Sequence, residues 1–337
     1  MLTYIGQLAE RWSSAPDPWT NVYGLARTIL ALATGGTIAF SETTTLFHPY
    51  AGLSGAPPIC ESKLAEIGLF CVLPLSPEAG RWLAVALLLV VAVGWRPRLT
   101  GIVHWWVSFS LTNNAVLVDG GDQVAMILSF LLIPITVSDG RVWHWQPPFN
   151  RPLNLREKLR RLVARSSFVL IMFQVAGIYF HSAIGKFSVD AWTNGTALYY
   201  WMLHPFFGAS PWLVSLLTPI LAHPVAITLL TWSVIVLEYM LSAAFFMTPR
   251  RRSLLLPFGI ALHVGIILIH GLVSFGSIMI AALVLFLRPI DCQLGWLRSS
   301  YRCDSRCQTT LLSGLPSNSS ASNVPRPPTR GVDDIYA

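Results

Sequence analysis

The chain has 337 residues, of which 53% are hydrophobic and only 12% are charged. An ordinary soluble domain carries about 25% charged residues, so this composition excludes a soluble globular protein and indicates an integral membrane protein. The net charge is +7, but the arginines cluster between apolar segments. That pattern is typical of orientation in a bilayer, so the positive charge does not indicate a nucleic-acid partner.

Eight apolar segments approach the length of about 20 helical residues that a membrane crossing needs. In chain order they are 22–40, 81–95, 101–118, 123–137, 166–184, 225–247, 253–270 and 272–287. A ninth apolar stretch, 212–221, is short and contains Pro219, which is typical of a re-entrant or interfacial piece. The sequence therefore predicts an all-α, polytopic integral membrane protein with about eight transmembrane helices.

Basic residues gather in four regions that eight spans would place on one side of the membrane: 96–98, 139–165, 250–252 and 288–306. The loops on the other side are mainly acidic, with Lys63 and Lys186 as the basic exceptions. By the positive-inside rule, both termini are cytoplasmic. The predicted organisation is a cytoplasmic segment over 1–21, a transmembrane domain over 22–290 and a cytoplasmic tail over 291–337, which is disordered because it is rich in Ser, Pro, Thr and Asn.

Ionisable side chains in a membrane span are costly and point to function. Lys186 lies at the outer end of the fifth span, five residues after His181. A lysine that loses its proton in a dry pocket can act as a base, whereas one at the surface extends its ammonium group to the headgroups. Glu238 and His263 lie inside the sixth and seventh spans, where a hydrogen bond between helices is the alternative to a functional role.

Further polar residues lie near the predicted outer surface. They are Asp119 and Asp122 in an acidic turn, Asn113 and Asn114 at the end of the third span, and Trp192 and Asn194 in the loop after Lys186. The two asparagines also fit a role in helix association. His104 and His144 each stand beside tryptophans, which predicts an aromatic belt at the interface. The arginine-rich stretch 156–165 is amphipathic and predicts a helix on anionic lipid.

Five cysteines are too few for a disulfide scaffold. Cys60 and Cys71 lie in the first outer loop, where disulfides persist, so they are a candidate pair. Cys292, Cys303 and Cys307 are cytoplasmic by the same topology and have no supporting histidine, so no metal site is expected. No soluble catalytic signature and no cofactor motif occurs in the chain.

Four blocks of the sequence carry a family resemblance: NVYGLARTILAL (21–32), GWRPRLTGIVHWWVSFS (94–110), DGGDQVAMILSFLLIPITVSDGRVWHW (119–145) and IYFHSAIGKFSVDAWTNGTALYYW (178–201). Together they resemble the SdpB family, the membrane protein of the sporulation-delaying antimicrobial peptide system. The resemblance implies a bacterial plasma-membrane protein that matures an exported, SdpC-like precursor with a small, SdpA-like partner. It does not specify a chemical step.

A wider resemblance is to the HTTM domain, the membrane part of vitamin K-dependent gamma-carboxylase. The matching positions are Tyr179, Phe180, Ala183, Lys186, Trp192 and Gly195. The resemblance puts that family's catalytic base on Lys186 and implies a quinone as cofactor. Asn113 and Asn114 match an Asn-Asn pair, but Ala115 stands where the carboxylase has a functional histidine. The large lumenal domain is also absent, so glutamate carboxylation is not expected.

We therefore expect an outward-facing polar pocket around Lys186. The candidate catalytic residues are Lys186, His181, Asp119 and Asp122, and the candidate substrate-binding residues are Asn113, Asn114, Trp192, Asn194, Glu238 and His263. Two alternatives to peptide maturation stay open. One is an HTTM-type enzyme acting on a quinone, lipid or peptide, and the other is a non-catalytic membrane scaffold for precursor and partner. The sequence does not decide whether the protein is an enzyme.

Overall fold

The computed structural model describes residues 2–47, 57–147, 152–289 and 293. Every regular element in these ranges is helical, apart from an isolated bridge between Trp95 and Trp143. The predicted all-α class is therefore confirmed. The predicted disordered tail over 291–337 lies outside the described residues except for residue 293, and Cys292, Cys303 and Cys307 also lie outside them.

Five helical segments in the described part of the chain are long and apolar enough to cross a membrane. They are α2 (Asn21–Phe40), α8 (Gly120–Ser138), α9 (Leu155–Lys186), α13 (Pro224–Ala243) with the 3-10 turn η1 (Ala244–Phe246), and 249–270, which contains α14 (Pro249–Ser253) and α15 (Leu256–His270). This is a membrane protein with several span-length helices. The count of eight spans stays a prediction.

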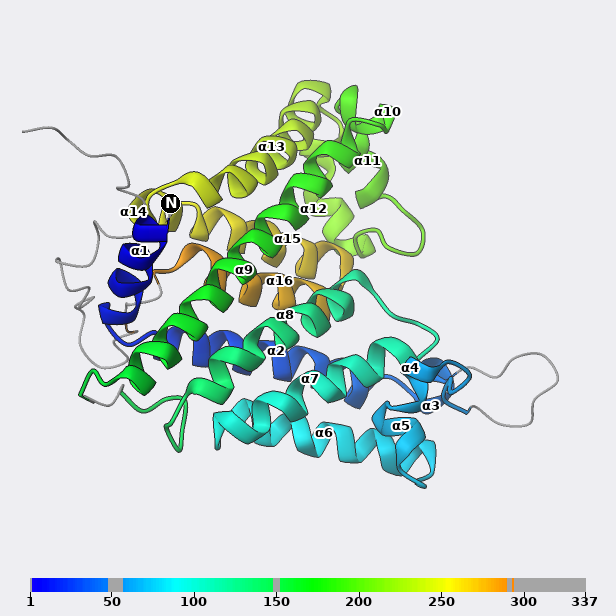
Figure 1. The fold of residues 1–337 in the computed structure, drawn as a ribbon. Coiled ribbons are helices and arrows are strands. Elements are labelled where there is room, and N and C mark those ends of the chain that lie inside the picture. Colours follow the sequence, from blue (N-terminus) through cyan, green and yellow to red (C-terminus); the bar gives the residue numbers. More distant parts are fainter. Residues whose placement is uncertain (1, 48–56, 148–151, 290–292, 294–337) are drawn as a thin grey trace, which may run out of the picture.

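The other three predicted spans also form helices, but these are shorter or less apolar. They are α6 (Pro77–Val93), α7 (Pro97–Asn114) and α16 (Val273–Leu287). The helix α7 begins four residues before the predicted span because Pro97 occupies its first turn, where a missing N–H costs nothing. In Figure 1, α6 and α7 run alongside α2 and α8 as part of the same bundle.

The helix α16 lies at the centre of the bundle and packs against α2, α8, α9 and α15. Its side chains from Ala281 to Leu287 are buried, and Phe286 is fully enclosed. A helix that is apolar on every side is expected to be buried in this way, because it has no polar face to present to water. The main hydrophobic core therefore surrounds α16.

The helix α9 has 32 residues, which corresponds to about 48 Å and exceeds a hydrocarbon layer of about 30 Å. The predicted fifth span and the amphipathic arginine stretch before it are thus one continuous helix. The helix α1 (Leu2–Ser14) packs on the first turns of α9. Lys158 of α9 pairs with Glu10 of α1 at 2.5 Å, and Arg161 of α9 pairs with Asp17, just after α1, at 2.6 Å. The predicted N-terminal segment 1–21 therefore contains a docked helix.

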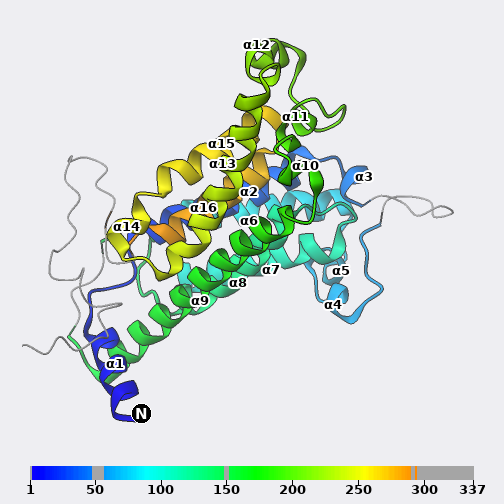
Figure 2. The ribbon, with the colours of Figure 1, turned by 90° about the horizontal axis from the view of Figure 1, so that it is seen from above.

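Two groups of short helices lie at the end of the bundle that is farther from α1 and α14. Figure 1 shows α3 (Thr43–Leu46), α4 (Lys63–Glu66) and α5 (Leu69–Val72) far from α1 and α14. Figure 2 shows α11 (Ala197–Met202) and α12 (Pro211–Leu221) projecting from the bundle, with α10 (Asp190–Thr193) nearby. The stretch predicted as re-entrant or interfacial corresponds to α12.

The aromatic-belt prediction for His104 and His144 is wrong, because both rings are buried, with 1% and 0% of their surface exposed. His144 turns inward where Gly94 leaves space: a Cβ on this glycine, whose φ is +92°, would lie 2.3 Å from the ring. Burial, together with nearby Arg27 and Arg141, lowers the pKa of His144 to about 3. The ring is therefore neutral at neutral pH.

The residues around His144 form a buried polar cluster that joins the 139–146 loop to α2 and α7. Asp139 and Arg141 form an ion pair at 2.7 Å, and Tyr23 donates its hydroxyl hydrogen to Asp139. Arg27 donates to the Thr100 hydroxyl at 2.6 Å. Since an unpaired buried charge is strongly destabilising, these mutual contacts are what make the cluster tolerable in the interior.

Candidate functional site

The candidate site is an ion pair between the end of α9 and a residue within α13. Lys186 is the last residue of α9, and its Nζ lies 2.6 Å and 2.9 Å from the two carboxylate oxygens of Glu238 on α13. The two side chains are only 15% and 10% exposed. Lys186 therefore points into the bundle, toward an acidic partner that lies 14 residues into a 20-residue apolar helix.

Two further groups hold the ammonium group in place. Ser182, one turn before Lys186 on α9, accepts a hydrogen bond from Nζ at 2.8 Å and donates one to Glu238 at 3.1 Å. The ring of Trp192 lies 5.0 Å from Nζ, a distance at which the face of an aromatic ring attracts a cation. Ser182 belongs to α9 itself, whereas Glu238 and Trp192 come from α13 and α10, so tertiary packing completes the site.

The position of Trp192 depends on a tight turn after α10. Gly195 has a φ of +80°, and a Cβ there would lie 2.5 Å from the Thr228 side chain on α13. The side chain of Asn194 closes the same turn by accepting hydrogen bonds from the backbone N–H and the hydroxyl of Thr196. Asn194 thus shapes the loop that carries Trp192, without contacting Lys186.

A second buried polar pair lies on the same face of α9. The Tyr179 hydroxyl lies 2.8 Å from Nε2 of His263 on α15, and both side chains are buried. The Nδ1 atom of His263 has no hydrogen-bond partner among the described residues. Tyr179, Ser182 and Lys186 are spaced three and four residues apart, which places them on one helix face toward α13 and α15.

A groove of about 440 Å³ lies on the adjacent face of α9. Its lining residues are Phe173, Gln174, Gly177, Ile178, His181 and Ser182. His181 is exposed and lines this groove, and it makes no hydrogen bond or ion pair with Lys186. Ser182 both lines the groove and bonds the ion pair, so the groove borders the site.

Asp119 and Asp122 are not brought to Lys186. They form a capping box at the start of α8, in which each carboxylate accepts a hydrogen bond from the backbone N–H of the other residue. This arrangement satisfies backbone donors at the helix start and gives both residues a local structural role.

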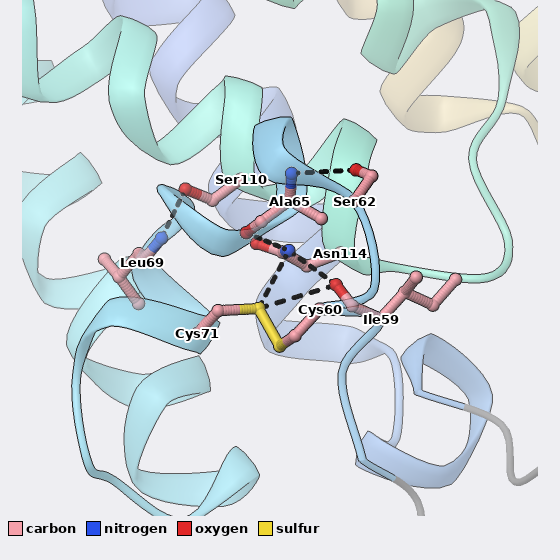
Figure 3. The surroundings of a disulfide bond; sticks show 8 residues. All are labelled: Ile59, Cys60, Ser62, Ala65, Leu69, Cys71, Ser110 and Asn114. Atoms are coloured by element: carbon pink, nitrogen blue, oxygen red, sulfur yellow. Dashed lines mark hydrogen bonds between the residues drawn. A yellow bond between two sulfur atoms is a disulfide. The ribbon is translucent and has the colours of Figure 1, made fainter.

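Asn113 and Asn114 are also placed away from Lys186. Asn113 donates to the Phe109 carbonyl within α7. Asn114 is buried and organises the loop between α2 and α6, because its amide donates to the carbonyls of Ile59 and Ala65. Figure 3 shows this amide beside a disulfide bond that joins Cys60 to Cys71.

The loop around this disulfide is expected to lose stability when either constraint is removed. Replacing Cys60 and Cys71 by serine should cost about 3 kcal/mol, since the bond closes an eleven-residue separation. Asn114→Ala should cost about 2 kcal/mol through the loss of buried hydrogen bonds. Thermal unfolding of purified protein measures both, and Asn113→Ala is the matched control. Equal effects of the two asparagine variants would contradict the assigned role of Asn114.

Of the predicted site residues, the structure brings together Lys186, Glu238 and Trp192, and it places His263 on the same face through Tyr179. Ser182 was missed by sequence reasoning, although its spacing of four residues from Lys186 is a usable signal. Among the described residues, no group of three or more His, Cys, Asp or Glu side chains could hold a metal ion.

Two curated proteins from Bacillus subtilis (strain 168) match most of the chain. The sporulation-delaying protein SdpB is 35% identical over 285 residues, which cover 84% of this chain and 85% of SdpB. The chain belongs to the SdpB family. The uncharacterized protein YitO is a further relative, 37% identical over 294 residues that cover 86% of this chain and 92% of YitO. No family model matches the chain, and no solved structure matches it.

Proposed function

We propose that this member of the SdpB family serves in the production of a secreted antimicrobial peptide, at the step that matures an exported, SdpC-like precursor. The support is the similarity to SdpB over most of both chains, together with the span-length helices. A small, SdpA-like protein is the proposed partner. The observation that carries a working site is the ion pair of Lys186 and Glu238 inside an apolar bundle.

The proposed topology has eight spans in the bacterial plasma membrane, with both termini cytoplasmic. The basic helix α14 lies at the same end of the bundle as α1 and the start of α9, which carry further arginines and lysines (Figure 1). The disulfide of Cys60 and Cys71 lies at the opposite end. Positive charge favours the cytoplasmic side and disulfides persist outside, so both features support this orientation.

In the proposed mechanism, Lys186 supplies or removes a proton at the substrate. A proton that moves from Nζ to Oε2 of Glu238, across the contact of 2.6 Å, leaves a neutral amine and a neutral carboxylic acid. The amine then accepts a proton from the substrate as a general base. Ser182 and Trp192 keep Nζ in position, and the groove beside Ser182 lets a membrane-embedded peptide approach from the lipid side.

Two other functions draw on the same geometry. A scaffold that holds precursor and partner is favoured by the ion pair, because a paired charge between α9 and α13 fixes these helices together. An HTTM-type enzyme is favoured by the groove, where Phe173 and Ile178 would pack against a quinone ring and His181 would bond its oxygen. A quinone would supply redox chemistry when bound, and a quinone that co-purifies with the protein would support this second alternative.

The test compares wild type with Lys186→Arg and Lys186→Met in cells that produce the precursor, at matched expression. Both variants are expected to abolish the mature peptide in mass spectra of the medium. Arginine keeps the charge and the pairing with Glu238 but does not lose its proton, so it separates a base from a fixed charge. Lys158→Arg, in the exposed pair with Glu10, is the control. Full product from Lys186→Arg would overturn the base and leave the scaffold.

A further inference from the structure

Another groove lies at the arginine-rich end of the bundle, far from Lys186. Its volume is about 660 Å³, and it runs between the start of α7, the end of α8 and the start of α9. Figure 1 shows these three helix ends close together at one end of the bundle. Its wall includes Val137, Leu155, Leu159 and Val163, and Arg98 and Arg156 also line it.

The wall of the groove is apolar and open to its surroundings. Val137 and Val163 are 46% and 47% exposed, and Leu155 and Leu159 are 74% and 53% exposed. These side chains belong to one stripe of α9 and the last turn of α8, and no element in the described part of the chain covers them. Exposed aliphatic side chains at this density in a membrane protein match the chemistry of an acyl chain.

The rim of the groove carries uncompensated positive charge. Arg98 and Arg156 come from different helices, and neither side chain has a hydrogen bond or ion pair among the described residues. Arg160 is different, because it donates to the Ser138 carbonyl and pairs with Glu157 at 2.9 Å. Glu157 is thus already engaged and does not neutralise Arg98 or Arg156. Two free guanidinium groups beside an apolar wall present bidentate donors to a phosphate.

We propose that this groove binds one anionic phospholipid, with an acyl chain against Val137, Leu159 and Val163 and the phosphate between Arg98 and Arg156. The site is separate from the ion pair of Lys186 and does not depend on the proposed function. Arg98 and Arg156 are the only groups needed for the preference for negative charge. The apolar wall distinguishes a lipid from a free phosphate ion, which has nothing to place there.

The experiment uses the full chain, purified in detergent and stripped of lipid. Lipid adducts are counted by native mass spectrometry during titration with phosphatidylglycerol or phosphatidylcholine. Wild type is expected to bind phosphatidylglycerol at least about tenfold more tightly, since each arginine near the headgroup favours anionic lipid. Arg98→Gln with Arg156→Gln should bring the two lipids within about twofold of each other. Arg250→Gln with Arg251→Gln, two exposed arginines on α14, should leave the preference unchanged.

Val137→Trp tests the acyl chain, because the indole narrows the groove at its apolar wall and leaves both arginines in place. It should weaken phosphatidylglycerol binding by about tenfold, which is the effect expected for removing a buried stretch of acyl chain. Equal binding of the two lipids by wild type would overturn the proposal, as would an unchanged preference in the double arginine variant. Competition by inorganic phosphate at a concentration equal to the lipid would show an anion site instead. Thermal unfolding of each variant verifies that it is folded.

Discussion

Exchanging the two partners of the ion pair between α9 and α13, by Lys186→Glu with Glu238→Lys, is expected to recover the stability that each single change loses, but not peptide production. Each single change leaves two like charges facing each other across 2.6 Å in the bundle, which should cost at least about 3 kcal/mol. The double exchange restores opposite charges, so it should recover most of that stability. It also moves the amine from the end of α9 onto α13, away from the Trp192 ring.

Two readouts are needed for this exchange. Thermal unfolding in detergent reports the fold, and mass spectrometry of the secreted peptide reports the function. We expect the double variant to unfold near wild type while its product falls by about 100-fold or more, the scale on which a general acid or base contributes to a rate. Product that recovers together with stability would instead identify the pair as a structural link between helices. Glu238→Gln distinguishes the effect of the negative charge from that of side-chain shape, because glutamine keeps the shape and loses the charge.

The sequence identified Lys186 and Glu238 as candidate residues, but it did not predict that they pair with each other. Lys186 and Glu238 both stand out as charges in or beside apolar spans. They are 52 residues apart, and the short helices α10 to α12 lie between α9 and α13 in the chain. Which charge faces which depends on how α9 and α13 pack, and helix packing leaves no periodic signal in a single sequence.

Asp119, Asp122 and Asn114 were predicted to lie in the pocket around Lys186, but their side chains instead bond backbone groups elsewhere in the structure. Asp119 and Asp122 are three residues apart at a helix start, the spacing at which two side chains can cap the same turn. Asn114 is the last residue of α7, and its amide bonds the backbone of a loop 55 residues earlier in the chain. The acidic spacing could have been recognised from the sequence, since capping is local. The partner of Asn114 could not, because it depends on the fold of the disulfide loop.

The bundle was more predictable than the site. In the part of the chain that the structure describes, hydropathy alone located the eight helices of 15 or more residues, since each needs only a run of apolar residues. It failed at boundaries: α9 starts eleven residues before the predicted span, because an amphipathic helix and a spanning helix join without a break. It failed also for His144, whose neighbouring tryptophans suggested an interface while Gly24 and Gly94 leave space for the ring inside the bundle.

The second large effect is expected at the buried pair of Asp139 and Arg141. Both side chains are 1% exposed, and the carboxylate also accepts the Tyr23 hydroxyl. Asp139→Asn leaves the arginine charge buried without an opposite charge, which should cost about 3 to 5 kcal/mol. The amide is nearly the same size as the acid, so the loss reports charge and hydrogen bonding and not packing volume.

The matched control is Glu10→Gln in the pair with Lys158, which has the same charge change at the same end of the bundle but lies in the open. An exposed ion pair contributes little, so this variant should unfold close to wild type. Thermal or denaturant unfolding in one detergent compares the two. Similar small effects would mean that water reaches Asp139, and that the loop over 139–146 is not the closed end of the bundle. A large loss of stability in Asp139→Asn alone would assign this cluster to stability. Peptide production should then fall only in proportion to the amount of folded protein, which leaves the proposed chemistry with Lys186.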